Sequence, residues 1–202
     1  MVPLRIGILG GTFNPIHKGH IMLAIRAKKA AKLDRVIFIP SNISYMKDQS
    51  EILPAKVRLE LVRDSITFEP SFEVSDMEIR RGGDSYTFET IEALKALYPQ
   101  DVLFFIVGAD TVFSMEKWQH PEVIFQNAHI LAASRKDFEP KALETKIHTL
   151  KEKYSANITV FSTENIDISS TMIRDALRSD HTAEGLLPEA VLRYMTEHHI
   201  TY

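Results

Sequence analysis

Short apolar segments alternate with longer segments of helical periodicity along most of the chain. The apolar segments favour strands, and in the longer segments apolar residues recur every three or four positions, as in an amphipathic helix. The predicted strands cover Arg5 to Leu9, Arg35 to Ile39, Phe72 to Ile79, Val102 to Val107, Ile130 to Ala133 and Ile158 to Phe161. The predicted helices cover Ile21 to Leu33, Ala55 to Ile66, Thr87 to Tyr98, Lys141 to Lys153, Thr171 to Arg178 and Pro188 to His198.

This alternation predicts an α/β fold with a mostly parallel sheet and helices on both faces. Right-handed crossovers would make the sheet doubly wound and Rossmann-like. The segment Val102 to Val107 is almost wholly apolar, as expected for a central strand that is buried on both faces. We expect residues 1–202 to form a single domain, with a small C-terminal helical part at about 165–202. Ligands of such sheets bind beyond the carboxyl ends of the strands, so candidate functional residues are those that follow each strand.

Composition narrows the class of protein. The 202 residues carry a net charge of −3, which gives no basic surface for nucleic acid and no sign of a membrane partner. The absence of cysteine excludes disulfides, thiolate nucleophiles and cysteine-ligated zinc. The sequence has neither a signal-peptide pattern at its start nor an apolar run of the roughly 20 residues that span a bilayer. We therefore expect a cytoplasmic protein.

The turn after the first predicted strand has the features of a phosphate site. It reads Gly10-Gly11-Thr12-Phe13-Asn14-Pro15-Ile16-His17-Lys18-Gly19-His20. Glycines let backbone amides approach a ligand closely, and a helix N-terminus attracts phosphate. His17 and His20 are three residues apart and share one face of a first helical turn, where both imidazoles could donate to phosphate oxygens. Taken alone, the glycines also fit a plain tight turn, and the histidines fit a surface pair or half of a metal site.

A second anion site is predicted near the C-terminus. Ile168-Ser169-Ser170-Thr171-Met172-Ile173-Arg174 precedes a short helix, and Ser169 or Ser170 is a natural N-cap. The hydroxyl groups at the helix N-terminus can bind an anion, and the Arg174 guanidinium suits bidentate contact with it. Taken alone, the segment also fits a plain helix cap followed by a solvated arginine.

Three further features could bind a nucleotide acceptor. Tyr86 and Thr87 follow a glycine-rich segment, Gly108 and Asp110 end the most apolar strand, and Trp118 follows shortly after. An Asp at a strand end can accept hydrogen bonds from ribose hydroxyls, and an aromatic face can stack on a pyridine ring. Alone, Asp110 could equally cap the next helix and Trp118 could be packed in the core.

Together these segments resemble the nucleotidyltransferase superfamily built around His-x-Gly-His, and in particular the bacterial nicotinate-nucleotide adenylyltransferases. The resemblance is carried by Gly-Gly-Thr-Phe-Asn-Pro-x-His-x-Gly-His, by Ile-Ser-Ser-Thr-x-Ile-Arg, and by Arg-x-Gly-x-Ser-Tyr-Thr followed by Gly-x-Asp and a Trp. It covers nearly the whole chain. The chain departs from the family pattern in three places: Asn14 replaces the usual Asp, Tyr45-Met46 stand where Pro-His precedes Lys47, and Lys136-Asp137 replace Pro-Gly after Arg135.

The resemblance implies an enzyme that transfers AMP from ATP to nicotinate mononucleotide in NAD synthesis, with Mg²⁺ bound through the ATP phosphates and with few protein ligands, none of which we assign. It implies catalytic roles for His17, His20 and Arg174. It implies ATP or phosphate contacts for Gly10, Gly11, Thr12, Phe13, Lys47, Arg135, Ser169, Ser170 and Thr171. It implies ribose contacts for Gly108 and Asp110, and nicotinate contacts for Tyr86, Thr87 and Trp118.

The sequence is compatible with several related activities. Backbone amides alone can recognise the nicotinate carboxylate, and such contacts leave no trace in the residue composition. The sequence therefore leaves nicotinamide mononucleotide open as the preferred acceptor. The chain could also be a sibling transferase that acts on phosphopantetheine or uses CTP, a nucleotide sensor without turnover, or a metallohydrolase. The expected partners are the small-molecule substrates, with neither nucleic acid nor membrane, and the sequence is compatible with a homo-oligomer.

Overall fold

The computed structural model describes residues 2–43, 52–134, 140–163, 168–178, 183 and 185–200. Its strands are β1 (Arg5–Gly11), β2 (Arg35–Pro40), β3 (Phe72–Val74), β4 (Val102–Gly108), β5 (His129–Ser134) and β6 (Ile158–Ser162). Its helices are α1 (Lys18–Ala31), α2 (Ala55–Ser65), α3 (Met77–Arg81), α4 (Thr87–Leu97), α5 (Ala109–Ser114), η1 (Met115–Lys117), α6 (Pro121–Asn127), α7 (Pro140–Tyr154), α8 (Ser170–Arg178) and α9 (Glu189–Glu197). This order confirms the predicted α/β class.

The strands form one sheet in the order β3-β2-β1-β4-β5-β6. β4 pairs with β1 and with β5, and β5 pairs with β6; all three pairings are parallel. The order of the strands reverses direction after β1, as in doubly wound sheets. The four residues Leu103 to Ile106 of the central strand β4 are each buried, because a strand inside a parallel sheet is covered on both faces.

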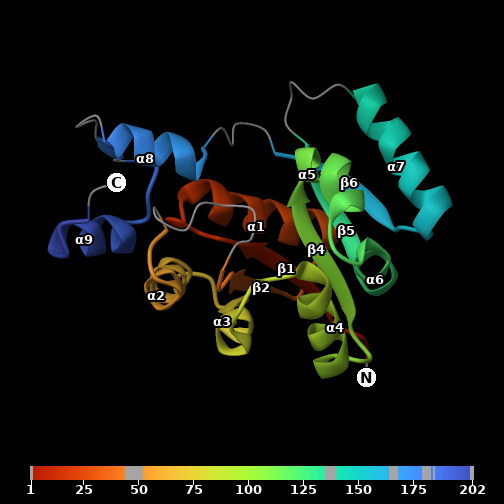
Figure 1. The fold of residues 1–202 in the computed structure, drawn as a ribbon, viewed down its shortest axis with the longest axis horizontal. Helices are drawn as coiled ribbons and strands as arrows, with labels where there is room; N and C mark the ends of the chain where they lie inside the picture. The colour runs from red at the N-terminus through yellow and green to blue at the C-terminus, as the bar shows by residue number, and fades with distance from the viewer. Residues whose placement is uncertain are drawn as a thin grey trace. The chain divides into compact units, whose positions relative to one another are not determined.

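The chain divides into two compact units. The first, called unit 1, comprises Met1–Leu9, Leu23–Ile37 and Tyr86–Asn165. In it α5 packs against β4, β5 and α7, and α4 packs against α6 (Figure 1). The carboxyl ends of β4 and β5 lie in this unit, so unit 1 carries the predicted acceptor residues.

The second unit, called unit 2, comprises Gly10–Met22, Phe38–Ser85 and Ile166–Tyr202. Its aromatic core joins three segments of the chain: the Phe38 ring centroid lies 6.1 Å from that of Phe13 and 5.3 Å from that of Phe72. Helix α2 packs against β3 and α9 (Figure 1). The histidine turn and α8 therefore belong to one compact body.

The prediction of a strand from Phe72 to Ile79 is wrong beyond Val74. The Ser75 amide donates to the carbonyl of Phe38, and the Ser75 hydroxyl then accepts from the amide of Met77, which begins α3. Because Ser and Asp side chains bind nearby backbone amides, they favour a helix start over continuation of a strand. Alternation of polar and apolar residues alone did not reveal this.

The segment after β4 also differs from the prediction, which assigned it no helix. Three short helices, α5, η1 and α6, occupy most of residues 109–127. None is longer than seven residues, so none shows the two turns of periodicity that a sequence pattern needs. The other predicted strands and helices are confirmed, with ends that shift by up to three residues.

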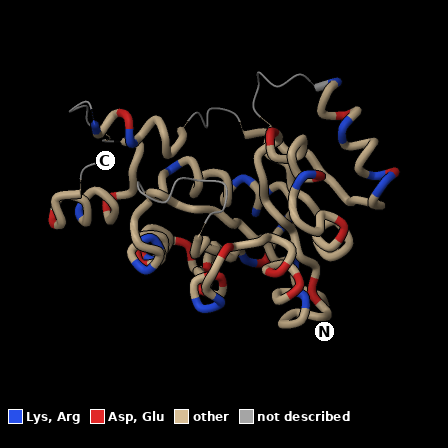
Figure 2. The backbone as a smooth tube through the Cα atoms, viewed as in Figure 1, with Lys and Arg blue, Asp and Glu red and all other residues tan. Residues whose placement is uncertain are grey.

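Side chains of both charges are interspersed on the helices. Figure 2 shows both basic and acidic positions along α2, α4 and α7. Among the described residues, no helix is long and apolar enough to cross a membrane.

Candidate active site

The turn between β1 and α1 brings the two predicted histidines into direct contact. The rings of His17 and His20 stack with centroids 3.7 Å apart, and the Phe13 ring packs edge-on against His20 at a centroid distance of 4.9 Å. Phe13 is 2% exposed and has a φ of 48°, a left-handed conformation that non-glycine residues seldom adopt. Buried ring contacts therefore hold a strained turn and both imidazoles in one arrangement.

A backbone hydrogen bond sets the proton position on His20. The amide of His17 donates to Nδ1 of His20 across 3.2 Å, so Nδ1 must carry a lone pair. The proton of the neutral ring is then on Nε2. His20 consequently presents an N–H donor at Nε2, which suits a phosphate oxygen.

Burial controls the charge of His17. The side chain is 4% exposed, and this desolvation lowers the pKa of His17 to about 4. Its Nδ1 atom is buried with no hydrogen-bond partner among the described residues. His17 is therefore a neutral imidazole at physiological pH, with a polar ring atom that a ligand could satisfy.

The predicted C-terminal anion site lies against the same turn. The Ser170 hydroxyl donates to the carbonyl of Pro15 at 3.3 Å, and the Arg174 guanidinium donates to the carbonyl of Asn14 at 3.0 Å. Arg174 also donates to the Thr171 hydroxyl at 3.2 Å. The two motifs thus converge within unit 2, which places two hydroxyls, two imidazoles and a guanidinium beside the N-termini of α1 and α8.

Ser169 and Gly19 allow the start of α8 to lie close to the histidine turn. The Ser169 hydroxyl accepts from the amide of Met172 at 3.1 Å, so Ser169 is the N-cap of α8. A Cβ atom on Gly19 would lie 2.9 Å from Nδ1 of His17 and 3.2 Å from the carbonyl oxygen of Ile168. Only glycine fits between the histidine turn and the chain entering α8.

The acceptor residues predicted in unit 1 lie on the segments around α4, α5 and η1. Tyr86 precedes α4 and Thr87 begins it, Gly108 precedes α5, and Asp110 is exposed in the first turn of α5. Trp118 directly follows η1 and is half-buried, with its ring edge-on to Phe105 at a centroid distance of 6.3 Å. This position of Trp118 is compatible both with contact to a ligand and with a packing role.

Two groups that sequence reasoning missed support this part of unit 1. His120 has a φ of 45° and packs edge-on against Phe88 at 4.6 Å, and Phe88 lies 6.1 Å from Tyr86, centroid to centroid. This chain of rings connects the start of α4 with the segment after Trp118. The only sequence sign was the aromatic content of the two segments.

An ion-pair cluster holds the short helix η1. Glu116 pairs with Lys146 and, at 3.0 Å, with Lys153, both on α7. Hydrogen bonds from these two ammonium groups lower the pKa of Glu116. Because Trp118 follows Glu116 by two residues, these ion pairs also hold the main chain that leads to the tryptophan.

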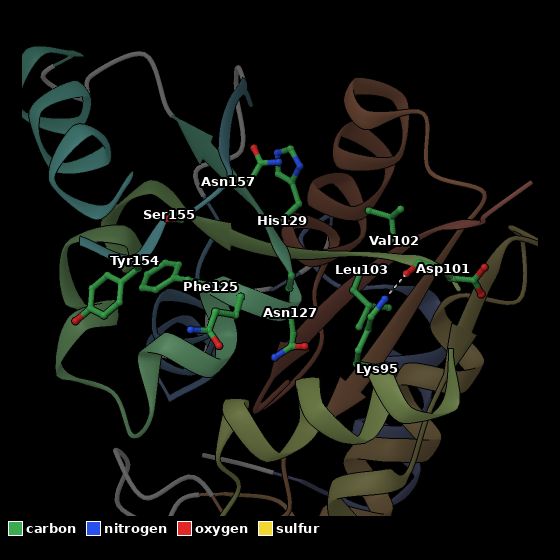
Figure 3. Close-up of a pocket in the computed structure, with 12 residues that line it drawn as sticks. Lys95, Asp101, Val102, Leu103, Phe125, Asn127, His129, Tyr154, Ser155 and Asn157 are labelled. Atoms are coloured by element: carbon green, nitrogen blue, oxygen red, sulfur yellow. Dashed lines mark hydrogen bonds between the residues drawn. The ribbon is translucent and has the colours of Figure 1, made fainter. Parts of the chain in front are cut away.

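One cavity in unit 1 is lined by a different set of residues. It has a volume of about 460 Å³, and Figure 3 shows Lys95, Asn127, His129 and Asn157 among the side chains around it. The lining residues come from the start of β4 and β5 and from the ends of α4, α6 and α7. Among the described residues, none of the predicted site residues lines this cavity.

The predictions for Lys47 and Arg135 lie outside the described residues.

Comparison with known proteins gives one consistent family. The cytidylyltransferase-like family model matches residues 8–176. The chain is 38% identical over 194 residues to a probable nicotinate-nucleotide adenylyltransferase of Lachnoclostridium phytofermentans, with 96% of this chain and 97% of that protein covered. It is 36% identical over 197 residues to a protein of the same name from Clostridium botulinum, with 97% of each covered.

Solved structures agree at the level of the fold. The nicotinic acid mononucleotide adenylyltransferase of Plasmodium falciparum complexed with NaAD has a TM-score of 0.81 at 15% identity, with 98% of this chain and 97% of that chain covered. The same parasite enzyme complexed with APC has a TM-score of 0.77 at 14% identity, with 98% and 96% covered.

Proposed function

The chain belongs to the nicotinate-nucleotide adenylyltransferase family, and from this we propose that it transfers the adenylyl group of ATP to nicotinate mononucleotide. The products are deamido-NAD and pyrophosphate, in the synthesis of NAD. The observation that carries the proposal is the convergence of the histidine turn and α8 in unit 2, through Ser170 with Pro15 and Arg174 with Asn14. The length of the family match, residues 8–176, supports the view that 1–202 act as one nucleotidyltransferase domain.

The proposed reaction is an in-line displacement at phosphorus. An oxygen of the acceptor 5′-phosphate attacks the α-phosphorus of ATP and forms the new P–O bond. The bond from the α-phosphorus to the bridging oxygen breaks, and pyrophosphate leaves with that electron pair. A phosphate oxygen is already nucleophilic at neutral pH, so no catalytic base or covalent enzyme intermediate takes part. Catalysis then consists of positioning and of stabilising charge on the phosphates.

Unit 2 supplies the groups that bind the triphosphate in this proposal. His17 and His20 bind the α- and β-phosphates, and His20 donates from Nε2 because its Nδ1 accepts from the His17 amide. His17 contributes a neutral imidazole, which adds a hydrogen bond without a fixed charge. Ser170, Thr171 and Arg174 bind the leaving pyrophosphate, with Ser169 as the cap that orients α8. Gly10, Gly11 and Thr12 contribute the acceptor side of the same turn, and Phe13 supports it.

Unit 1 supplies the acceptor contacts. Tyr86, Thr87 and Trp118 contact the nicotinate group, and Gly108 and Asp110 contact ribose. Aromatic stacking suits a pyridine ring, and an exposed Asp beside a strand end suits ribose hydroxyls. Two cationic residues complete the proposal on family resemblance alone: Lys47 and Arg135 at the ATP phosphates.

ATP enters as its magnesium complex in this proposal. Among the described residues, no group of three His, Asp or Glu side chains could hold a metal ion. A magnesium ion carried by nucleotide phosphates keeps several waters and needs few protein ligands. The donors in unit 2 are imidazole, hydroxyl and guanidinium groups, which bind phosphate oxygens and leave the metal to ATP.

The test is pyrophosphate release from ATP with a panel of acceptors. We expect release with nicotinate mononucleotide, and a lower kcat/KM with nicotinamide mononucleotide. Phosphopantetheine with ATP, and CTP in place of ATP, serve as the sibling reactions. Pyrophosphate release with phosphopantetheine but with neither mononucleotide would contradict the proposal, as would binding of ATP without release in any mixture.

Substrates of this kind favour a cytoplasmic location for the enzyme.

A further inference from the structure

A charged side chain lies in the interior of unit 2 outside the groups discussed so far. Arg58, on α2, is 1% exposed and is the largest fully buried side chain among the described residues. Transfer of a charge to the interior is unfavourable unless hydrogen bonds replace its water. The partners of Arg58 therefore show what its burial achieves.

The Arg58 guanidinium donates to four main-chain carbonyls. Nε donates to Leu53 at 2.8 Å and Nη1 donates to Thr12 at 2.6 Å. Nη2 donates to Ser41 at 2.7 Å and to Asn42 at 3.0 Å. These carbonyls belong to three separate segments: the histidine turn, the chain that leaves β2 and the chain that enters α2.

The three segments are also joined directly to one another. The amide of Ser41 donates to the carbonyl of Gly11 at 3.0 Å, and the amide of Leu53 donates to the Asn14 side-chain oxygen at 2.9 Å. The Gly11 carbonyl is thus tied to Ser41 and the Asn14 side chain to Leu53, while Arg58 bonds the Thr12 carbonyl between them. The Asn14 side chain, at the position where the family usually has Asp, takes part through its oxygen, which an Asp would also offer.

A guanidinium suits this task in a way that an ammonium does not. Its five N–H donors lie in one rigid plane, so the four carbonyls are held in fixed mutual directions. A lysine ammonium at the same place is a point charge on a flexible chain, and it cannot reach all three segments together. Substitution of Arg58 by Lys would therefore preserve the buried charge while it releases the geometry.

We propose that Arg58 is a positioning residue for adenylyl transfer, which holds the Thr12 backbone and through it the turn that carries His17 and His20. The inference rests on the proposed function of this site, and Arg58, which is 1% exposed, acts through the main chain that it holds. A displacement of about 1 Å in a catalytic group can lower turnover about 100-fold. Loss of the planar Arg58 guanidinium should lower turnover by about the same factor.

The test compares R58K with R63M, a control on the same helix. Arg63 is exposed and pairs with Glu60, so its loss should leave turnover unchanged. For R58K, assayed well below its melting temperature, we expect kcat to fall about 100-fold while KM for the mononucleotide changes less than about threefold. Circular dichroism gives the folded fraction, so that kcat refers to folded protein alone.

A double-mutant cycle separates positioning from folding. If Arg58 acts by placing the turn, R58K should lower kcat much less in an H20A background than in the wild type, because the group it places is already missing. Equal effects in both backgrounds, an R58K chain that fails to fold, or wild-type kcat per folded R58K molecule would overturn the proposal.

Measurement of ATP affinity keeps the test of Arg58 separate from the test of the proposed acceptor. If the wild type turns over no acceptor, the proposed function fails, and affinity for ATP alone by calorimetry becomes the readout for Arg58. We then expect R58K to bind ATP about tenfold more weakly than the wild type and R63M, since the turn is displaced. Equal affinity of all three proteins would contradict a positioning role on this measure also.

Discussion

The guanidinium of Arg174 donates to the carbonyl of Asn14 over 3.0 Å, across a sequence separation of 160 residues. This hydrogen bond ties the turn after the first strand to the helix that carries the C-terminal hydroxyls. A second bond, from the Ser170 hydroxyl to Pro15, makes the same connection one turn earlier in α8. The way in which these groups and the acceptor residues are held leads to four testable expectations.

Replacement of Arg174 by Met should lower kcat about 100-fold, because the leaving pyrophosphate would lose a charged donor. Stability should fall by about 1 kcal/mol, since the part-buried hydrogen bond to the Asn14 carbonyl is lost. Pyrophosphate release and urea unfolding measure the two effects. The control is R178M on the same helix, where Arg178 pairs with Asp175 at the surface; a comparable loss of turnover in R178M would show that the effect is not specific to Arg174.

Replacement of His20 by Ala should raise the barrier to transfer by about 3 kcal/mol, as for removal of one oxyanion donor. The loss of stability should be smaller, about 1 kcal/mol, because the hydrogen bond from the His17 amide is lost. H20Q should keep part of the activity, because its amide nitrogen can occupy the place of Nε2, the atom left as donor when Nδ1 accepts from His17. Steady-state kinetics of both variants test this. The exposed His148, paired with Glu152, provides the control H148A. Near-normal turnover in H20A would remove His20 from the mechanism.

His17 should make stability depend on pH. Its folded pKa of about 4 lies below the unfolded value of 6.5, so the unfolded chain takes up the proton first. The contribution of His17 is complete above pH 6.5 and is lost as the pH falls toward 4, by about 3 kcal/mol over that interval. Urea unfolding of the wild type and of H17Q at several values between about pH 7 and about pH 4 should show a shallower slope in the variant. Parallel slopes would mean that His17 is protonated as easily in the folded chain.

Replacement of Trp118 by Leu should raise KM for nicotinate mononucleotide about fivefold and leave KM for ATP near its wild-type value, since a stacked ring contributes about 1 kcal/mol. The variant F68L removes a ring that is 61% exposed and serves as the control. The two KM values are measured by varying one substrate at saturating concentration of the other. If KM for both substrates rises equally, or neither changes, Trp118 packs the segment after η1 without contacting the acceptor.

Particular residues show where sequence reasoning succeeded. The glycine, histidine and hydroxyl residues of the two motifs were recognisable because their chemistry depends on spacing within a single turn or helix start. The alternation of apolar runs and helical periods gave the α/β class and most element boundaries. The helices between Ala109 and Asn127 were too short to show a period. The end of β3 depended on a backbone bond between Ser75 and Phe38, which no local pattern records.

The sequence by itself determined the fold class, the family resemblance and the residue types of both phosphate-binding motifs, because these follow from local periodicity and spacing. Only the tertiary structure decided that Arg174 and Ser170 reach the histidine turn and that Arg58 is buried among four carbonyls. The physical reason is that hydrogen bonds and desolvation depend on which distant segments pack together. Helical spacing puts Arg58 on the same face of α2 as Leu61 and Val62, but nothing in the sequence specifies which carbonyls its guanidinium meets.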